Sequence, residues 1–78
     1  MTDEKAAAIA AKLWPALPMA RHYPDKTNGG TFYEVGYFRS ERLRDENCAV
    51  SVGAGWSWEE AFNMLPHNLR QQAMKEMV

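Results

Sequence analysis

The sequence predicts a small α+β domain: an N-terminal helix, an antiparallel sheet of two or three strands, and one or two C-terminal helices packed on one face of that sheet. Three segments lead to this prediction. They are an alanine-rich stretch at 5–14, an alternating run of aromatic and β-branched residues at 31–39, and a helix start at Ser57 after a second strand-like run. A chain of 78 residues has room for one hydrophobic core, so residues 1–78 are expected to form a single domain.

The first helix is expected over Lys5–Trp14. Thr2 is its expected N-cap, and Asp3 and Glu4 place negative charge at the positive end of the helix dipole. The stretch is rich in alanine, the strongest helix former. Pro15 ends the helix, because the residue before a proline is disfavoured in the helical conformation.

The central strand is expected over Thr31–Arg39, where aromatic and β-branched residues suit a pleated sheet. Met19–Tyr23 is either a short strand or irregular chain, and Pro24–Gly30 is rich in turn-forming residues. Alternation along the central strand places Phe32, Glu34, Gly36 and Phe38 on one face and Tyr33, Val35, Tyr37 and Arg39 on the other. The sequence leaves open which of these faces packs against the helices.

A second strand is expected over Cys48–Val52. Ser40–Asn47 is a charged connection that joins it to the central strand. Because hairpin loops are usually shorter, either the strands extend inward or the tip of the hairpin protrudes. Gly53–Gly55 is expected to turn the chain into the next helix. The face of this strand expected to be buried consists of Cys48, Val50 and Val52, with the thiol acting as a small hydrophobic group.

The helix after this strand begins with a recognisable N-terminal capping signal. Ser57 can accept a hydrogen bond from the backbone of Glu60, whose side chain can reach back to Ser57, which is the reciprocal capping box. The apolar residues that follow recur at helical spacing and form one stripe: Trp58, Ala61, Phe62 and Leu65. Pro66 interrupts this helix and is expected at the first position of a further helix over His67–Met77.

Composition argues against several classes of function. The net charge is −1, from nine Lys and Arg against ten Asp and Glu, so the basic excess typical of nucleic-acid binders is missing. The start of the chain is acidic and no apolar segment reaches the length of a membrane span. We therefore expect a cytoplasmic protein that does not bind membranes, with its single cysteine reduced.

Catalysis and cofactor binding are not expected. The soft or imidazole ligands are Cys48, His22 and His67, and no pair of them has the spacing of a metal site. Neither histidine belongs to a nucleophile–base motif. Glu59 and Glu60 have a sufficient explanation as helix-start residues. We therefore predict a protein that is not an enzyme and needs no cofactor.

Binding to another protein is the function favoured by the residues. Tyrosine and arginine are the residue types that most often dominate protein interfaces, and charged side chains steer and orient the encounter. The expected anchors are the two tyrosines of the central strand, and the expected steering charges lie on the connection that follows it. The predicted protein-binding residues are Tyr33, Tyr37, Arg39, Glu41, Arg42, Arg44, Asp45 and Glu46.

The pattern of strand, charged turn, strand, glycine-rich junction and capped helix is similar to that of some small proteins encoded by bacteriophages and prophages, among them anti-CRISPR proteins. The resemblance is one of overall character, and it assigns no role to any single residue. It implies a phage-encoded, non-catalytic inhibitor that acts in the cytoplasm of the host bacterium. Its partner would be a host protein or ribonucleoprotein complex of the CRISPR–Cas kind.

Two weaker resemblances suggest an alternative. The element order resembles the double-stranded-RNA-binding domain, although that family carries lysines where this chain has Trp58, Glu59 and Glu60. The sequence Gly-x-Ser-x-Glu-Glu-Ala resembles the helix start of some antitoxins of toxin–antitoxin pairs. The alternative is therefore a nucleic-acid-binding or antitoxin-like regulator that acts as a homodimer, with its hairpin completing a sheet between subunits.

Overall fold

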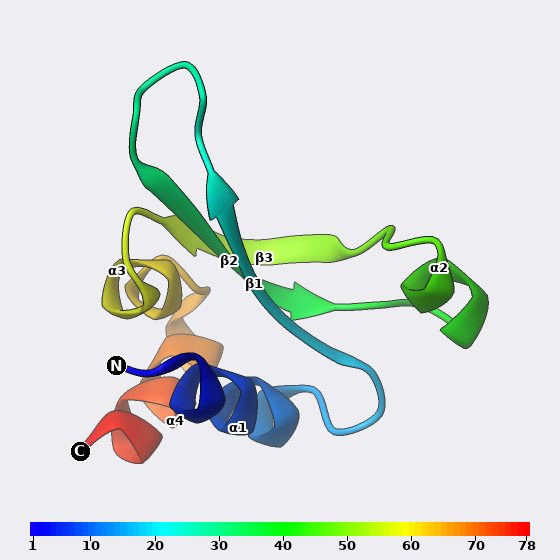
Figure 1. Ribbon diagram of the computed structural model, residues 1–78. Coiled ribbons are helices and arrows are strands. Elements are labelled where there is room, and N and C mark those ends of the chain that lie inside the picture. Colours follow the sequence, from blue (N-terminus) through cyan, green and yellow to red (C-terminus); the bar gives the residue numbers. More distant parts are fainter.

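The computed structural model describes residues 1–78, and it confirms the predicted α+β class. In chain order the elements are α1 (Asp3–Leu13), β1 (Pro18–Pro24), β2 (Thr31–Tyr37), α2 (Glu41–Asp45), β3 (Val50–Gly55), α3 (Trp58–Asn63) and α4 (His67–Met77). The strands form one antiparallel sheet in the order β1-β2-β3. Helices α1, α3 and α4 lie together on one face of this sheet, and α2 lies beyond its end (Figure 1).

Helix α1 begins as the sequence predicts. The Thr2 hydroxyl accepts a hydrogen bond from the backbone N–H of Lys5 at 3.1 Å. The residues that α1 buries, Ala6, Ile9 and Ala10, share one face at the expected helical spacing. Small alanines on this face let the helix lie close to β1 and α4, the elements with which it packs.

The segment before the turn, for which the sequence allowed two structures, is a strand. β1 pairs with β2 in a register that sets Arg21 opposite Glu34 and Tyr23 opposite Phe32. The predicted turn between them is held by the Asp25 carboxylate, which accepts hydrogen bonds from the chain at 27 and 28.

The odd-numbered face of β2 packs against the helices. Val35 is fully buried in the core, and the ring of Tyr33 lies 4.9 Å from that of Trp58 in α3. The even-numbered residues therefore lie on the face that no helix covers (Figure 1). The strand ends at Tyr37, earlier than the predicted end at Arg39.

The charged connection after β2 contains a short helix, α2, that the sequence did not predict. The strands do not extend into the connection, which lies beyond the end of the sheet (Figure 1). The Ser40 hydroxyl caps α2 by accepting from the backbone N–H of Leu43 at 3.1 Å, and the chain leaves the helix through Asn47 in the left-handed conformation, with φ of 57°. Five residues are too few to show helical periodicity, and so the cap at Ser40 was the only usable signal.

The second predicted strand is displaced toward the C-terminus. β3 spans Val50–Gly55, so Gly53–Gly55 is strand and not the expected turn. Glycine is needed there because α3 crosses closely: a Cβ on Gly53 would overlap the carbonyl of Ala61, and one on Gly55 would overlap the Glu60 side chain. The expected burial of Cys48 was also wrong, because it precedes β3 and its side chain is exposed.

Helix α3 supplies the centre of the core. Ser57 accepts from the backbone N–H of Glu60 at 3.1 Å, as predicted, while the Glu60 side chain packs over Gly55 and does not complete the capping box. Pro66 is the N-cap of α4 and not its first helical residue. The predicted stripe of α3 lies wholly within the core. The core cluster consists of Ala6, Ile9, Val35, Trp58, Ala61, Phe62, Leu65 and Ala73.

Candidate open-face binding site

The sheet has one face that no helix covers, and this face carries a distinct group of side chains. Its position follows from the register of β1, β2 and β3, which brings alternate residues of the strands to the same side. Helices α1, α3 and α4 lie on the opposite side of the sheet, and α2 lies beyond its end (Figure 1). We call this group the open face; it consists of Arg21, Tyr23, Phe32, Glu34, Ser51 and Trp56.

Aromatic rings form a continuous row across one end of the open face. Tyr23 and Phe32 have ring centroids 5.8 Å apart, and Phe32 meets Trp56 edge to face at 5.4 Å. Tyr23 and Trp56 nevertheless remain 43% and 49% exposed. A shallow hollow of about 320 Å³ opens beside Trp56, toward the β1–β2 turn. The row thus forms a partly exposed apolar surface with a shallow hollow at its Trp56 end.

A polar network occupies the centre of the open face. The Glu34 carboxylate accepts from Arg21 Nε at 3.1 Å, and Glu34 is only 8% exposed. Arg21 Nη1 also donates to the backbone oxygen and the side-chain oxygen of Asn47, at 3.2 and 3.0 Å. Because Asn47 follows α2, Arg21 ties the short helix to the sheet.

The network keeps Glu34 ionised. Burial alone raises the pKa of this carboxyl, but hydrogen bonds from Ser51, Arg21 and Tyr23 outweigh that effect and hold the pKa below its usual value. In turn, desolvation and the neighbouring carboxylate raise the pKa of the Tyr23 phenol. The face therefore presents a fixed charge pair beside an apolar row.

The two tyrosines predicted as exposed anchors lie on the other face of β2. Tyr33 packs between His22 and Trp58, at ring distances of 5.4 and 4.9 Å, and Tyr37 lies 6.2 Å from Trp14. Both are partly buried against the helix side of the sheet. Tyr37 also lines a shallow apolar groove of about 220 Å³ with Leu13, Trp14, Pro15, Ala16, Leu17 and Phe38.

The predicted charged residues are exposed, as a steering surface requires. Arg39 precedes α2, and α2 and its C-cap carry the others: Glu41, Arg42, Arg44, Asp45 and Glu46. Two pairs of them lie within ion-pair distance, Arg42 with Glu46 at 3.5 Å and Arg44 with Asp45 at 4.0 Å. The structure thus separates the predicted charges, on and beside α2, from the predicted tyrosines, which face the helices.

Sequence reasoning missed most of the open face. Arg21 and Tyr23 belong to a segment whose structure was left undecided, and Trp56, which directly precedes the predicted helix cap Ser57, was given no binding role. The signal that could have found them is alternation: in a strand over 18–24, Arg21 and Tyr23 share a face and His22 takes the other. Once β1 pairs with β2, that face joins Phe32 and Glu34.

A second polar cluster fastens the N-terminus to the rest of the fold. The Asp3 carboxylate accepts from Trp58 Nε1 at 3.0 Å and lies 3.0 Å from His22 Nε2. These hydrogen bonds, the one with His22 foremost, lower the pKa of Asp3. A carboxylate paired with an imidazole also occurs in catalytic dyads. Here the Asp3 carboxylate is occupied by its contacts to His22 and Trp58, which join α1 to β1 and α3.

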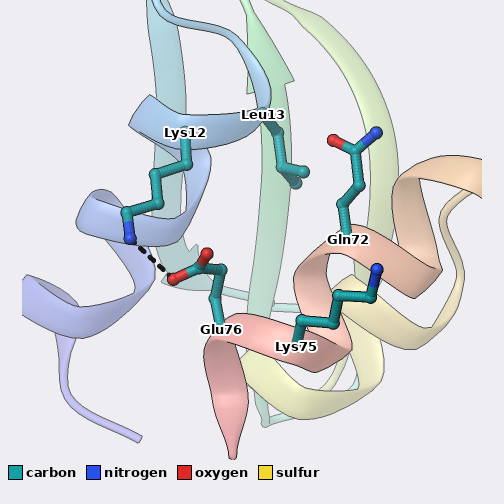
Figure 2. A pocket seen from close by; sticks show the side chains of 5 residues that line it. All are labelled: Lys12, Leu13, Gln72, Lys75 and Glu76. Atoms are coloured by element: carbon teal, nitrogen blue, oxygen red, sulfur yellow. Dashed lines mark hydrogen bonds and ion pairs between the residues drawn. The ribbon is translucent and has the colours of Figure 1, made fainter.

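The groove between α1 and α4 is also closed by a polar contact. Lys12 Nζ lies 2.8 Å from Glu76 Oε2, and Leu13, Gln72 and Lys75 complete the lining of a hollow of about 180 Å³ (Figure 2). Lys12 and Glu76 reach toward each other across the gap between the helices (Figure 2). We interpret this contact as a fastening of α4 to α1 at the surface.

Comparisons with known proteins identify no relative of this chain. No protein-family model, no curated protein and no solved structure matched this chain. None of its helices combines the length and apolarity needed to cross a membrane. No group of three or more His, Cys, Asp or Glu side chains is arranged to hold a metal ion.

Proposed function

We propose that this protein is a non-catalytic domain that binds another protein through the open face. The observation that supports this most is the row Tyr23–Phe32–Trp56, whose rings pack on one another while the outer two remain nearly half exposed. Rigid aromatic side chains beside an arginine are the composition of interface hot spots. The anchors in this proposal therefore move from Tyr33 and Tyr37 to the opposite face, while Arg39 and the charges of α2 keep a steering role.

A narrower form of the proposal concerns the partner. We propose that the chain is a phage-encoded inhibitor that acts in the bacterial cytoplasm by covering a functional surface of a host defence complex of the CRISPR–Cas kind. A small rigid domain suits stoichiometric occlusion because little conformational entropy is lost when its preformed surface binds. This form has a direct assay: expression of the chain should restore plasmid transformation in bacteria whose CRISPR–Cas system otherwise eliminates the plasmid.

The binding proposal is tested by cross-linking followed by reconstitution. A photoreactive phenylalanine analogue at position 32 or 56 should capture a protein that mass spectrometry can identify. The purified partner should then bind the wild-type chain, and Tyr23→Ala with Trp56→Ala should weaken binding by at least a hundredfold, since aromatic hot spots each contribute about 2 kcal/mol or more. Met64→Ala is the matched control, because Met64 is a 63% exposed apolar residue at the end of α3. Equal loss in the control variant, or no loss in the open-face variant, would reject the open face as the binding site.

The second candidate is a homodimeric, nucleic-acid-binding or antitoxin-like regulator, and one observation favours it. β3 is an edge strand whose span Val50–Gly55 contains neither proline nor charge, whereas β1, the other edge, has proline at both ends. Proline and charge are common protections against edge pairing. Light scattering after size-exclusion chromatography should then give a dimer mass that Ser51→Lys reduces to that of a monomer. Binding to DNA or RNA should also weaken steeply with salt.

A further inference from the structure

We propose that the partner segment recognised by the open face is acidic, with a carboxylate bound by Arg21 and an apolar side chain placed against Trp56. This inference rests on the proposed function and specifies the chemistry of its partner. The structural basis is a rigid, partly exposed guanidinium that shares one face of the sheet with the aromatic row.

Arg21 has hydrogen-bond donors left over. Its Nε–H is used by Glu34, and its Nη1 donates to both oxygens of Asn47. A guanidinium has five N–H donors, so the hydrogens of Nη2 have no acceptor within the chain. The contacts to Glu34 and Asn47 hold the planar group in one orientation, and a preorganised arginine loses little entropy when a carboxylate binds it.

The open face presents positive charge outward. The Glu34 side chain is 11% exposed and that of Arg21 is 31% exposed. The cation of this ion pair is therefore more accessible to a partner than the anion. At the turn beyond the aromatic row, the Asp25 carboxylate is occupied by hydrogen bonds within the turn, and Lys26 is exposed. Electrostatic complementarity therefore favours a partner carboxylate over a partner ammonium.

The sheet register fixes the spacing between the two contact points. Arg21 lies on β1 and Trp56 directly follows β3, with β2 between them. Two strand spacings give roughly 10 Å across the sheet, and two residues give roughly 7 Å along it, so the contact points are roughly 12 Å apart. An extended partner rises about 3.3 Å per residue. The carboxylate and the apolar residue should thus be about four positions apart.

The test is selection from a library of random twelve-residue peptides displayed on phage, with the purified full chain as target. Enriched peptides should contain Asp or Glu about four positions from Trp, Phe or Leu. For a synthetic peptide of that kind, Arg21→Lys should weaken binding about tenfold, because lysine keeps the charge but cannot make the contacts to Glu34 and Asn47 that hold the free Nη2 donors in place. Replacing the peptide's acidic residue by its amide should remove that difference. Arg70→Lys, on α4, is the matched control, and thermal denaturation checks that each variant is folded.

The outcomes separate this inference from the proposed function. Peptides that depend on Trp56 but contain no acidic residue, or that bind Arg21→Lys as tightly as the wild type, would overturn the acidic partner and leave the open face as a binding site. Peptides whose affinity is unchanged by Trp56→Ala would overturn both. Selection of lysine- or arginine-rich peptides would contradict the charge argument directly.

Discussion

The two faces of the sheet are built from similar residue types but have different surroundings. On the covered face, Tyr33 and Val35 meet side chains from α3, and Gly53 lets that helix approach the backbone. On the open face, Phe32 packs on the rings of its neighbours Tyr23 and Trp56. An aromatic residue is therefore core or surface according to whether another layer covers it, which the alternation of one strand does not specify.

The two faces also differ in how they accommodate polar groups. Glu34 can be nearly buried on a face without a helix because hydrogen bonds satisfy its carboxylate. No buried side-chain nitrogen or oxygen in the chain lacks a hydrogen-bond partner. The covered face instead excludes water with apolar groups. The open face thus needs no covering layer to satisfy its buried carboxylate, and Tyr23 and Trp56 remain nearly half exposed.

The largest effect that would test this contrast is the removal of a buried ring. Phe62 is fully buried beneath the sheet, and Phe62→Ala should lower the free energy of unfolding by about 3–5 kcal/mol through lost burial and the cavity left behind. Phe32→Ala on the open face should cost far less, because its ring packs on partly exposed neighbours. Urea denaturation of both variants measures the difference, and equal losses would mean that the open face is part of the core.

A smaller effect is expected where α3 approaches the sheet. A Cβ at Gly53 would overlap the Ala61 carbonyl and the Leu65 side chain, so Gly53→Ala should destabilise the fold by about 1–3 kcal/mol through overpacking. Gly30→Ala is the matched substitution on the other side, because a Cβ there would lie 3.5 Å from the Trp56 ring, an ordinary contact. If thermal melts show the same loss for both, the close packing of α3 on β3 is not what requires glycine.

The sequence was sufficient for the parts of the fold that have local signals. Caps at Thr2 and Ser57 and the stripe through Phe62 predicted α1 and α3, because capping and helical periodicity are properties of neighbouring residues. The end of β3 was not predicted, since glycines that usually turn a chain were required here by a helix crossing the strand. Helix α2 was missed because one turn has no period to detect.

The candidate site depended on information that no single segment contains. The open face is assembled from three strands, and Arg21 and Trp56 lie far apart in the sequence. The predicted tyrosines had the right chemistry for an interface, but their orientation depended on which face α3 would cover. The charged residues of α2 were predicted to be exposed because solvated charge needs no tertiary partner, and they are.

Acid should weaken both sides of the sheet through two carboxyls. Asp3 on the helix side and Glu34 on the open face have pKa values in the folded chain below the ordinary 3.8 and 4.5. Their stabilising contribution is therefore complete above those values and is lost as pH falls through the lower folded-state pKa values. Urea midpoints measured from neutral pH down to about pH 3 should fall in that range. Asp3→Asn and Glu34→Gln should each start lower at neutral pH and decline less; an unchanged decline in both would assign the acid sensitivity to other groups.

The smallest effect on stability is expected at the residue proposed to matter most for binding. Trp56 is 49% exposed and packs on Phe32 edge to face, so Trp56→Ala should cost only about 0.5–1.5 kcal/mol, the range of one aromatic pair. Trp56 continues the row of Phe32 and Tyr23, and a contiguous exposed apolar patch of this kind is typical of interaction sites. A melting curve close to that of the wild type, together with loss of partner binding, would separate the two roles. A loss of stability as large as that of Phe62→Ala would instead make Trp56 a structural residue and remove the main support for the open face as an interface.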